Sequence, residues 1–340
     1  MINERLTVRR VMNPDTVRFI DDSYDRSVKD PFLLTVDDIE GLLSIDPDSE
    51  ECEYMGTKAR ELARIRSNNK ASVSTSFGLD YIPCKASCRF CSFGERWGLM
   101  KGQEYYIPDD EIVSMIRDQL SKGFRKFTLR TTEYYSVDRI CDLARKIRAE
   151  IADEKFILSV NMGELSVDDV KRLKECGINN AYHTLHLREG VDTPFRPETR
   201  LRTMANIKAG GLNLSCGVDP IGIEHTNREL AENIVVLREQ EPRSICSMMR
   251  VNPKGTPVGD LPEISENRHA QIAAVIRFAS RNNVSAVPPN RKAMMWGANG
   301  TAIGTGANPR DSVHDKDTVG EWRFSFEDTR QMFRDTGYDI

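Results

Sequence analysis

The sequence predicts an α/β fold, namely a complete or partial (β/α)8 barrel of the TIM type with an N-terminal helical extension. From Ala71 onward, short apolar runs alternate with longer stretches whose apolar residues recur at helical spacing. Such alternation is typical of parallel strands joined by crossover helices. Strands are expected at residues 72–77, 126–131, 156–160, 180–185, 212–218, 246–251 and 284–287, and helices at 109–123, 137–149, 166–177, 199–211, 227–240 and 266–282. This number of units favours a barrel over a two-domain enzyme.

The regions on either side of the repeat lack the alternation. The first 70 residues contain two helical stretches, 35–43 and 49–66, and the first begins with acidic residues that suit the helix dipole. After Gly304 the chain becomes polar and irregular, with a final helix expected near 326–334. We therefore expect a helical extension over 1–70, the barrel over 71–305 and a C-terminal tail over 306–340.

Composition excludes several classes of protein. Hydrophobic residues make up 39% and charged residues 29% of the 340 residues, with a formal net charge of -4. This balance lacks the basic footprint of a nucleic-acid-binding protein. No apolar run approaches the roughly 18 residues of a membrane helix, and the opening MINERLTVRR has no apolar signal core. We expect a cytoplasmic protein with no nucleic acid or membrane partner, whose eight cysteines are thiols or metal ligands.

Three of these cysteines lie within eight residues, CKASCRFC, directly after the first expected strand. In a (β/α)8 barrel the chemistry takes place at the C-terminal ends of the strands, so Cys84, Cys88 and Cys91 have the position of a site. A zinc site would need four ligands, or three and a water, usually with histidine, and the first histidine is His183. Three thiolates with an open fourth position favour a [4Fe–4S] cluster.

The spacing C-x3-C-x2-C, with the aromatic Phe90 before the third cysteine, resembles the signature of radical S-adenosylmethionine (SAM) enzymes. In that family SAM binds the open iron, and one electron from the cluster cleaves it to a 5′-deoxyadenosyl radical that removes hydrogen from the substrate. The resemblance implies a [4Fe–4S] cluster and SAM as cofactors, a small-molecule substrate, and an electron donor such as ferredoxin or flavodoxin.

Residues 72–304 are most similar to the biotin-synthase-like branch of this family. The segments LRTTEYY, YHTLHL, TRLRT and CGVDPIGIEHT resemble those that contact SAM. The resemblance implies cofactor-binding roles for Phe90, Glu133 (SAM ammonium), Thr184 and His186 (ribose and methionine), Arg200 (SAM carboxylate) and Ile221 (adenine). It assigns no catalytic residue beyond the cluster. Because side chains alternate along a strand, only one of His183 and His186 is expected inside the barrel, and we favour His186.

Several chemistries remain open within this branch. Sulfur insertion, as in biotin or lipoyl synthesis, requires a second cluster. Only Cys216 matches the cysteines that bind this cluster in biotin synthase, and Arg291 is a candidate for its arginine ligand. Cys246 is the other cysteine at the start of an expected strand that could point into the barrel. We expect no second cluster, and structural roles for Cys52, Cys141 and Cys176. LREGVDTPFRPETR and DPIGIEHT resemble iron-hydrogenase cofactor maturases and archaeal-type lipoyl synthases. We expect a radical enzyme of cofactor biosynthesis or maturation, with sulfur insertion, carbon-skeleton rearrangement as in methylornithine synthase, or a non-catalytic Fe–S protein as alternatives.

Overall fold

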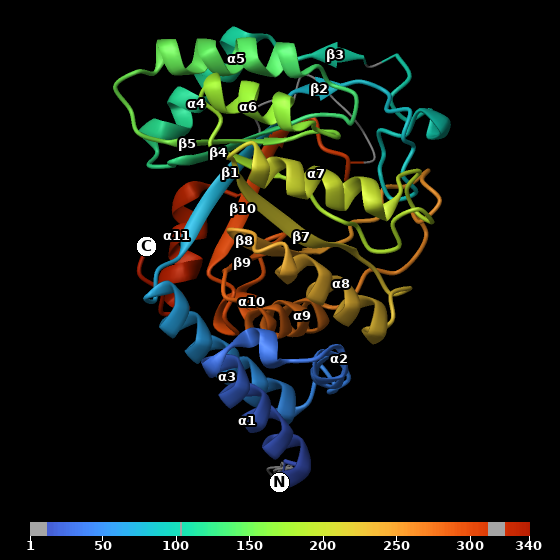
Figure 1. Ribbon diagram of the computed structural model, residues 1–340, viewed down its shortest axis with the longest axis vertical. Helices are drawn as coiled ribbons and strands as arrows, with labels where there is room; N and C mark the ends of the chain where they lie inside the picture. The colour runs from blue at the N-terminus through green and yellow to red at the C-terminus, as the bar shows by residue number, and fades with distance from the viewer. Residues whose placement is uncertain (1–11, 103, 312–323) are drawn as a thin grey trace, which may run out of the picture.

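The computed structural model describes residues 12–102, 104–311 and 324–340. Its centre is a closed barrel of parallel strands in the order β1-β10-β9-β8-β7-β6-β5-β4 (Figure 1). The barrel closes because β1 pairs with β10 on one side and with β4 on the other. The strands are β1 (Ser72–Gly78), β4 (Lys126–Arg130), β5 (Ile157–Asn161), β6 (Asn180–Tyr182), β7 (Asn213–Ile221), β8 (Ser244–Met249), β9 (Asn283–Val287) and β10 (Gly300–Gly306). The predicted fold class is confirmed, and the barrel is complete.

Helices connect successive strands around the outside of the barrel. They are α4 (Asp109–Ser121), α5 (Val137–Glu150), α6 (Val167–Glu175), α7 (Pro197–Ala209), α8 (Asn227–Glu239), α9 (Glu266–Ala279) and α10 (Arg291–Met295). Their starts follow from local sequence: Ser166 and Thr226 each form a reciprocal capping box with the acidic residue three positions later. Across the described ranges, no helix combines the length and the apolar character needed to cross a membrane.

The strands differ from the sequence expectation at several places, among them β7 and β8, which were expected at 212–218 and 246–251. The eighth strand, β10, was not predicted, because its sequence GTAIGTG contains three glycines, which have low strand propensity. At Gly304 a side chain would meet the Ser76 hydroxyl, so the close approach of β1 to β10 favours glycine there. The strand expected at 180–185 ends at Tyr182. A small antiparallel sheet of β2 (Asp80–Tyr81) and β3 (Tyr105–Tyr106) was also not predicted.

The segment before the barrel forms three helices, α1 (Pro14–Lys29), α2 (Val36–Leu43) and α3 (Glu50–Ser67), which lie against α8 and α9 (Figure 1). The Arg66 guanidinium donates to the backbone carbonyl of Ser280 at 2.6 Å, which ties α3 to the end of α9. The expected final helix is present as α11 (Phe326–Asp335), and its Phe326 ring lies 4.2 Å from that of Phe124. The expected irregular tail falls largely on residues 312–323, outside the described ranges.

The inside of the barrel is polar and hollow. Most TIM barrels fill this space with layers of branched apolar side chains. Here the inward positions are largely small and polar: Ser72, Ser74, Ser76, Thr128, Ser159, Asn180, Ser215, Ser244, Ser285 and Thr301. They line a cavity of about 1060 Å³ that extends to the C-terminal ends of the strands. The fold therefore provides a water-accessible chamber large enough for a small molecule and part of a cofactor.

Candidate active site

Eight of the nine predicted site residues line this cavity: Cys84, Cys88, Phe90, Cys91, Glu133, Thr184, His186 and Arg200. The ninth, Ile221, is buried at the end of β7 and is not among the lining residues, although the preceding Pro220 is. The structure thus brings together side chains from the cysteine loop, from the loops after β4 and β6, and from the first turn of α7. Their individual roles remain predictions.

The cysteine loop is held by its own backbone. Cys84 N–H donates to the carbonyl of Phe93 at 2.6 Å, and Cys91 N–H donates to that of Cys88 at 3.0 Å. The indole N–H of Trp97 donates to the Cys88 carbonyl at 3.3 Å. Two further backbone bonds tie the loop to the rest of the chain, because Arg89 N–H donates to the Asp192 carbonyl and Ser92 N–H donates to that of Pro309.

The surroundings of the sulfurs fit a cluster better than a single zinc ion. Tetrahedral zinc with Zn–S bonds of about 2.3 Å would hold all its sulfurs within about 4.6 Å of one another. Among the described residues, only Asp192, Glu224 and His225 bring three such ligand atoms within 4.8 Å, and the cysteines do not. Burial raises the pKa of the Cys91 thiol to about 12, while N–H groups of Phe93 and Gly94 act in the opposite direction. Such N–H groups beside thiolates suit an iron–sulfur cluster.

Arg200, at the start of α7, connects the loops after three strands. Its guanidinium lies 3.0 Å from Glu133 after β4, 2.8 Å from Glu164 after β5 and 3.7 Å from Glu189 after β6. The guanidinium also lies over the ring of Phe195, 3.9 Å from its centre. Burial disfavours the charge of Arg200, yet the three carboxylates raise its pKa above the ordinary value. Glu164 and Glu189 were missed because no motif separates them from other acidic residues after strands.

The loop that carries Glu133 is anchored by Thr132. The Thr132 backbone N–H donates to Asp80 Oδ1 at 2.9 Å. The Thr132 hydroxyl donates to the other carboxylate oxygen of Asp80. These two hydrogen bonds to β2 fix the loop.

Both His183 and His186 line the cavity, so the expectation that only one of them faces it was wrong. The reason is that β6 ends at Tyr182, and strand alternation does not extend to the histidines. His186 Nδ1 lies 2.9 Å from Glu189 Oε2, and its ring centre lies 5.7 Å from that of Phe90. Burial lowers the pKa of His186, but the bond to Glu189 and the charge of Asp219 raise it above the ordinary value overall.

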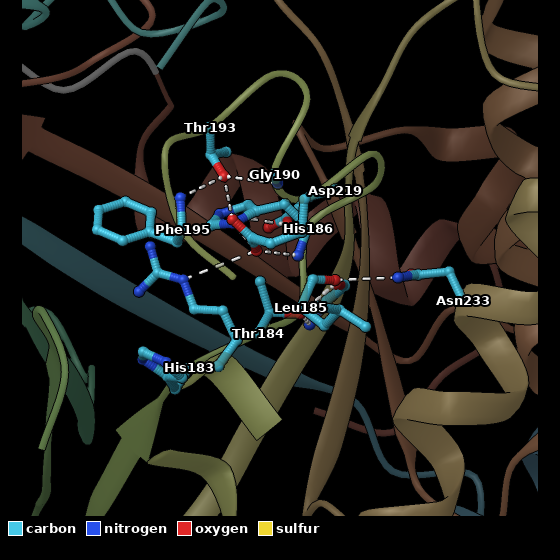
Figure 2. Close-up of polar contacts among 12 residues, drawn as sticks. His183, Thr184, Leu185, His186, Gly190, Thr193, Phe195, Asp219 and Asn233 are labelled. Carbon is cyan, nitrogen blue, oxygen red and sulfur yellow. Dashed lines mark hydrogen bonds and ion pairs between the residues drawn. The ribbon is translucent and has the colours of Figure 1, made fainter. Parts of the chain in front are cut away.

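Thr184 fixes the loop after β6 rather than leaving its hydroxyl unused. The hydroxyl donates to the Gly217 carbonyl on β7 at 2.7 Å. The backbone carbonyl of the following residue, Leu185, accepts a hydrogen bond from the Asn233 side chain of α8 at 3.0 Å (Figure 2). The proposed SAM contact of Thr184 would therefore have to share a hydroxyl that already makes a hydrogen bond.

A second polar cluster lies on the walls formed by β6, β7 and β8. The Tyr182 hydroxyl donates to Asp219 Oδ2 and lies 3.5 Å from Cys246 Sγ. Gly217 lies opposite them, where a side chain would clash with both groups. Cys216, the next residue to Gly217, is also buried, and burial raises the pKa of Asp219. Arg291, by contrast, is exposed on α10 and pairs with Asp335, so it does not reach this cluster.

Comparisons with known proteins show which proteins this chain is similar to. Residues 83–235 match the family model described as the radical SAM superfamily. Biotin synthase of Clostridium botulinum (strain Hall) is 22% identical over 264 residues, which cover 75% of this chain and 80% of that protein. Biotin synthase of Gloeothece citriformis is 24% identical over 269 residues, which cover 74% of this chain and 73% of that protein.

Two solved structures share the fold over nearly the whole chain. HydG, a maturase of the [FeFe]-hydrogenase, superposes with a TM-score of 0.78 at 16% identity, covering 97% of this chain and 76% of HydG. Methylornithine synthase (PylB) superposes with a TM-score of 0.74 at 17% identity, covering 92% of this chain and 95% of that protein. The predicted resemblance to the biotin-synthase-like branch is confirmed.

Proposed function

We propose that this chain, a radical SAM enzyme, holds its [4Fe–4S] cluster on Cys84, Cys88 and Cys91 and binds SAM between the cluster and Arg200. The observation that supports this most is the shared cavity wall: the three cysteines and the Arg200–Glu133 pair line the same chamber. When bound, the reduced cluster and SAM supply a 5′-deoxyadenosyl radical that removes a hydrogen atom from the substrate. An electron donor such as ferredoxin or flavodoxin would reduce the cluster.

Glu133 and Arg200 are the residues that would orient SAM. The methionine part of SAM has an ammonium and a carboxylate group, and the pair presents the complementary charges. On binding, the Arg200–Glu133 contact of 3.0 Å would be exchanged for two contacts with SAM. Glu164 and Glu189 would keep the Arg200 guanidinium oriented during this exchange, because they contact it from two further loops. Phe90 and His186 lie together beside the loop and would contact the nucleoside part.

The substrate of this reaction would be a small molecule inside the barrel. The chamber of about 1060 Å³ has hydroxyl, amide and charged side chains among apolar ones in its lining and extends below the cysteine loop. The relatives named above include biotin synthases, a hydrogenase maturase and methylornithine synthase, so we place the reaction in cofactor biosynthesis or maturation. Hydrogen abstraction without sulfur insertion is favoured, because Cys216 and Cys246 are the only thiols among the described residues that line the barrel besides the three of the cysteine loop.

The test is SAM cleavage by the reconstituted protein. Under anaerobic conditions with dithionite, the wild type is expected to form 5′-deoxyadenosine, measured by liquid chromatography. Cys88→Ala should abolish the product. Cys141→Ala, a buried thiol in α5 away from the cavity, is the matched control and should retain it. Product formation by Cys88→Ala would contradict the cluster assignment, and a bound cluster without any SAM cleavage in the wild type would favour the non-catalytic alternative.

A further inference from the structure

The inner face of β4 carries an arginine that, unlike the buried Arg238 and Arg277, lines the barrel cavity. Arg130 Nη1 donates to the Ser76 hydroxyl at 2.9 Å, and Nη2 donates to the Ala307 carbonyl at 2.6 Å. Its Nε is buried without a partner. Within the described ranges, no carboxylate oxygen lies within 4.0 Å of this guanidinium, and Asp311 and Asp80 act on its charge only from a greater distance. Among the described residues, the groups that contact Arg130 directly are therefore neutral.

Other buried arginines show what a structural role looks like in this chain. Arg277 also lacks a carboxylate, but its three nitrogens donate to Gly297 O, Asn282 O and Asn299 Oδ1. It lies outside the set of residues that line the cavity. Arg130 uses two of the five N–H donors of a guanidinium. Arg238 likewise donates to two neutral acceptors and has a buried Nε without a partner, but it lies outside the cavity. A charge taken out of water without a counterion is costly. Because Arg130 faces the cavity, an anion bound there could supply the counterion.

A second cation on the same strand face strengthens the argument. Lys126 lies four residues before Arg130, and side chains at even spacing along a strand share a face. Its ammonium group donates to the Ser72 hydroxyl at 2.6 Å and, within the described part of the chain, has no carboxylate within 4.0 Å. Burial and the charge of Arg243 lower the pKa of Lys126. The β4 wall therefore presents positive charge along the depth of the cavity, and the side chains that accept hydrogen bonds from it are the hydroxyl groups of Ser72 and Ser76.

We infer that the substrate carries an anionic group, a carboxylate or a phosphate, which Arg130 binds through its unused N–H donors inside the barrel. This inference rests on the proposed function, because it takes the barrel cavity to be the substrate site. A planar guanidinium donates to two oxygens of such a group at once, which would neutralise the charge and orient the rest of the molecule. With the anion at the β4 wall, the remainder of the substrate would face Tyr182, Asp219 and Cys246 on the opposite strands.

Anion binding is tested on the anaerobically reconstituted protein with inorganic phosphate and acetate as probes. Thermal unfolding is followed at constant ionic strength, with chloride as the reference salt. Phosphate or acetate should raise the midpoint saturably, and Arg130→Gln should weaken that apparent affinity about tenfold, the effect of losing one charge-assisted contact. Arg130→Lys should retain part of it. Arg145→Gln, an exposed arginine on α5, is the matched control and should change nothing.

The outcomes separate this inference from the proposed function. No saturable shift with either anion, or an equal shift in Arg130→Gln, overturns the inference whether or not SAM is cleaved. Loss of the shift when SAM is added also overturns it, because Arg130 would then serve the SAM carboxylate. If anion binding depends on Arg130 but the protein cleaves no SAM, the anion site is supported and the proposed radical function is refuted. If Arg130→Gln does not fold, Ser76→Ala, which removes the hydroxyl that orients the guanidinium, must show the weakened affinity instead.

Discussion

Arg200 and Glu133, 67 residues apart in the sequence, form an ion pair of 3.0 Å at the mouth of the barrel, beside the cysteine loop. The pair is held from two sides, because Arg200 also contacts Glu164 and Glu189. A zwitterion such as the methionine part of SAM can replace this ion pair with two new ones, between its ammonium group and Glu133 and between its carboxylate and Arg200. This relationship gives the first prediction.

Glu133→Gln and Arg200→Ala should each weaken SAM binding about tenfold or more, because a hydrogen bond to a charged group contributes about 1.5–3 kcal/mol. Equilibrium dialysis of labelled SAM against the anaerobic protein measures the effect. Glu198→Gln, an exposed carboxylate in the first turn of the same helix α7, is the control and should bind SAM normally. Unchanged affinity in both site variants would place the SAM clamp elsewhere.

The second prediction concerns iron content. Cys141, Cys176 and Cys52 are buried in the helical layer, and the Cys246 thiol lies beside Tyr182. Reconstitution should therefore give about four irons per chain, those of one [4Fe–4S] cluster. The Cys84/Cys88/Cys91 triple Ala variant should bind almost none. Iron that persists in the triple variant and is lost on changing Cys216 or Cys246 would revive the sulfur-insertion alternative.

A third prediction follows from the pKa of His186. Burial lowers it, but Glu189 and Asp219 raise it above the ordinary value overall. The charged imidazole therefore stabilises the folded state, fully at pH below about 6.5 and progressively less as the pH rises through the folded pKa. Urea unfolding should show a larger loss of stability for His186→Asn at about pH 6 than at about pH 9. A pH-independent difference would show that folding leaves the pKa of His186 unchanged.

The fourth prediction concerns Gly217. A methyl group there would clash with Cys246 Sγ and with the Tyr182 hydroxyl. Gly217→Ala should lower the free energy of unfolding by about 1–3 kcal/mol, the usual cost of overpacking. Ser159→Ala, on another strand lining the same cavity, is the control and should cost less. Adding Cys246→Ala to Gly217→Ala should recover part of the loss, and no recovery would mean that Tyr182 alone limits the space.

Local sequence patterns were enough to predict the fold class of this protein and the family it resembles. The alternation of apolar runs with helical stretches predicted the barrel, because strand and helix periodicities arise from each segment by itself. The spacing of Cys84, Cys88 and Cys91 predicted the family for the same reason, since ligands within one short loop are close in any fold. The glycine-rich β10 was missed, because its strand conformation depends on pairing with β1 rather than on its own residues.

The tertiary structure alone decided which distant side chains meet. Closure of the barrel brings Glu133, Glu164 and Glu189 into ion pairs with the one guanidinium of Arg200. It also leaves Arg130 among hydroxyl and carbonyl groups without a carboxylate among the described residues. Sequence spacing carries no information on such contacts. Neighbouring parallel strands are separated in the sequence by a whole helix and its loops, so residues that meet in space lie far apart in the sequence. The charge balance of the cavity, and with it the expected anionic substrate, could therefore be read only from the folded chain.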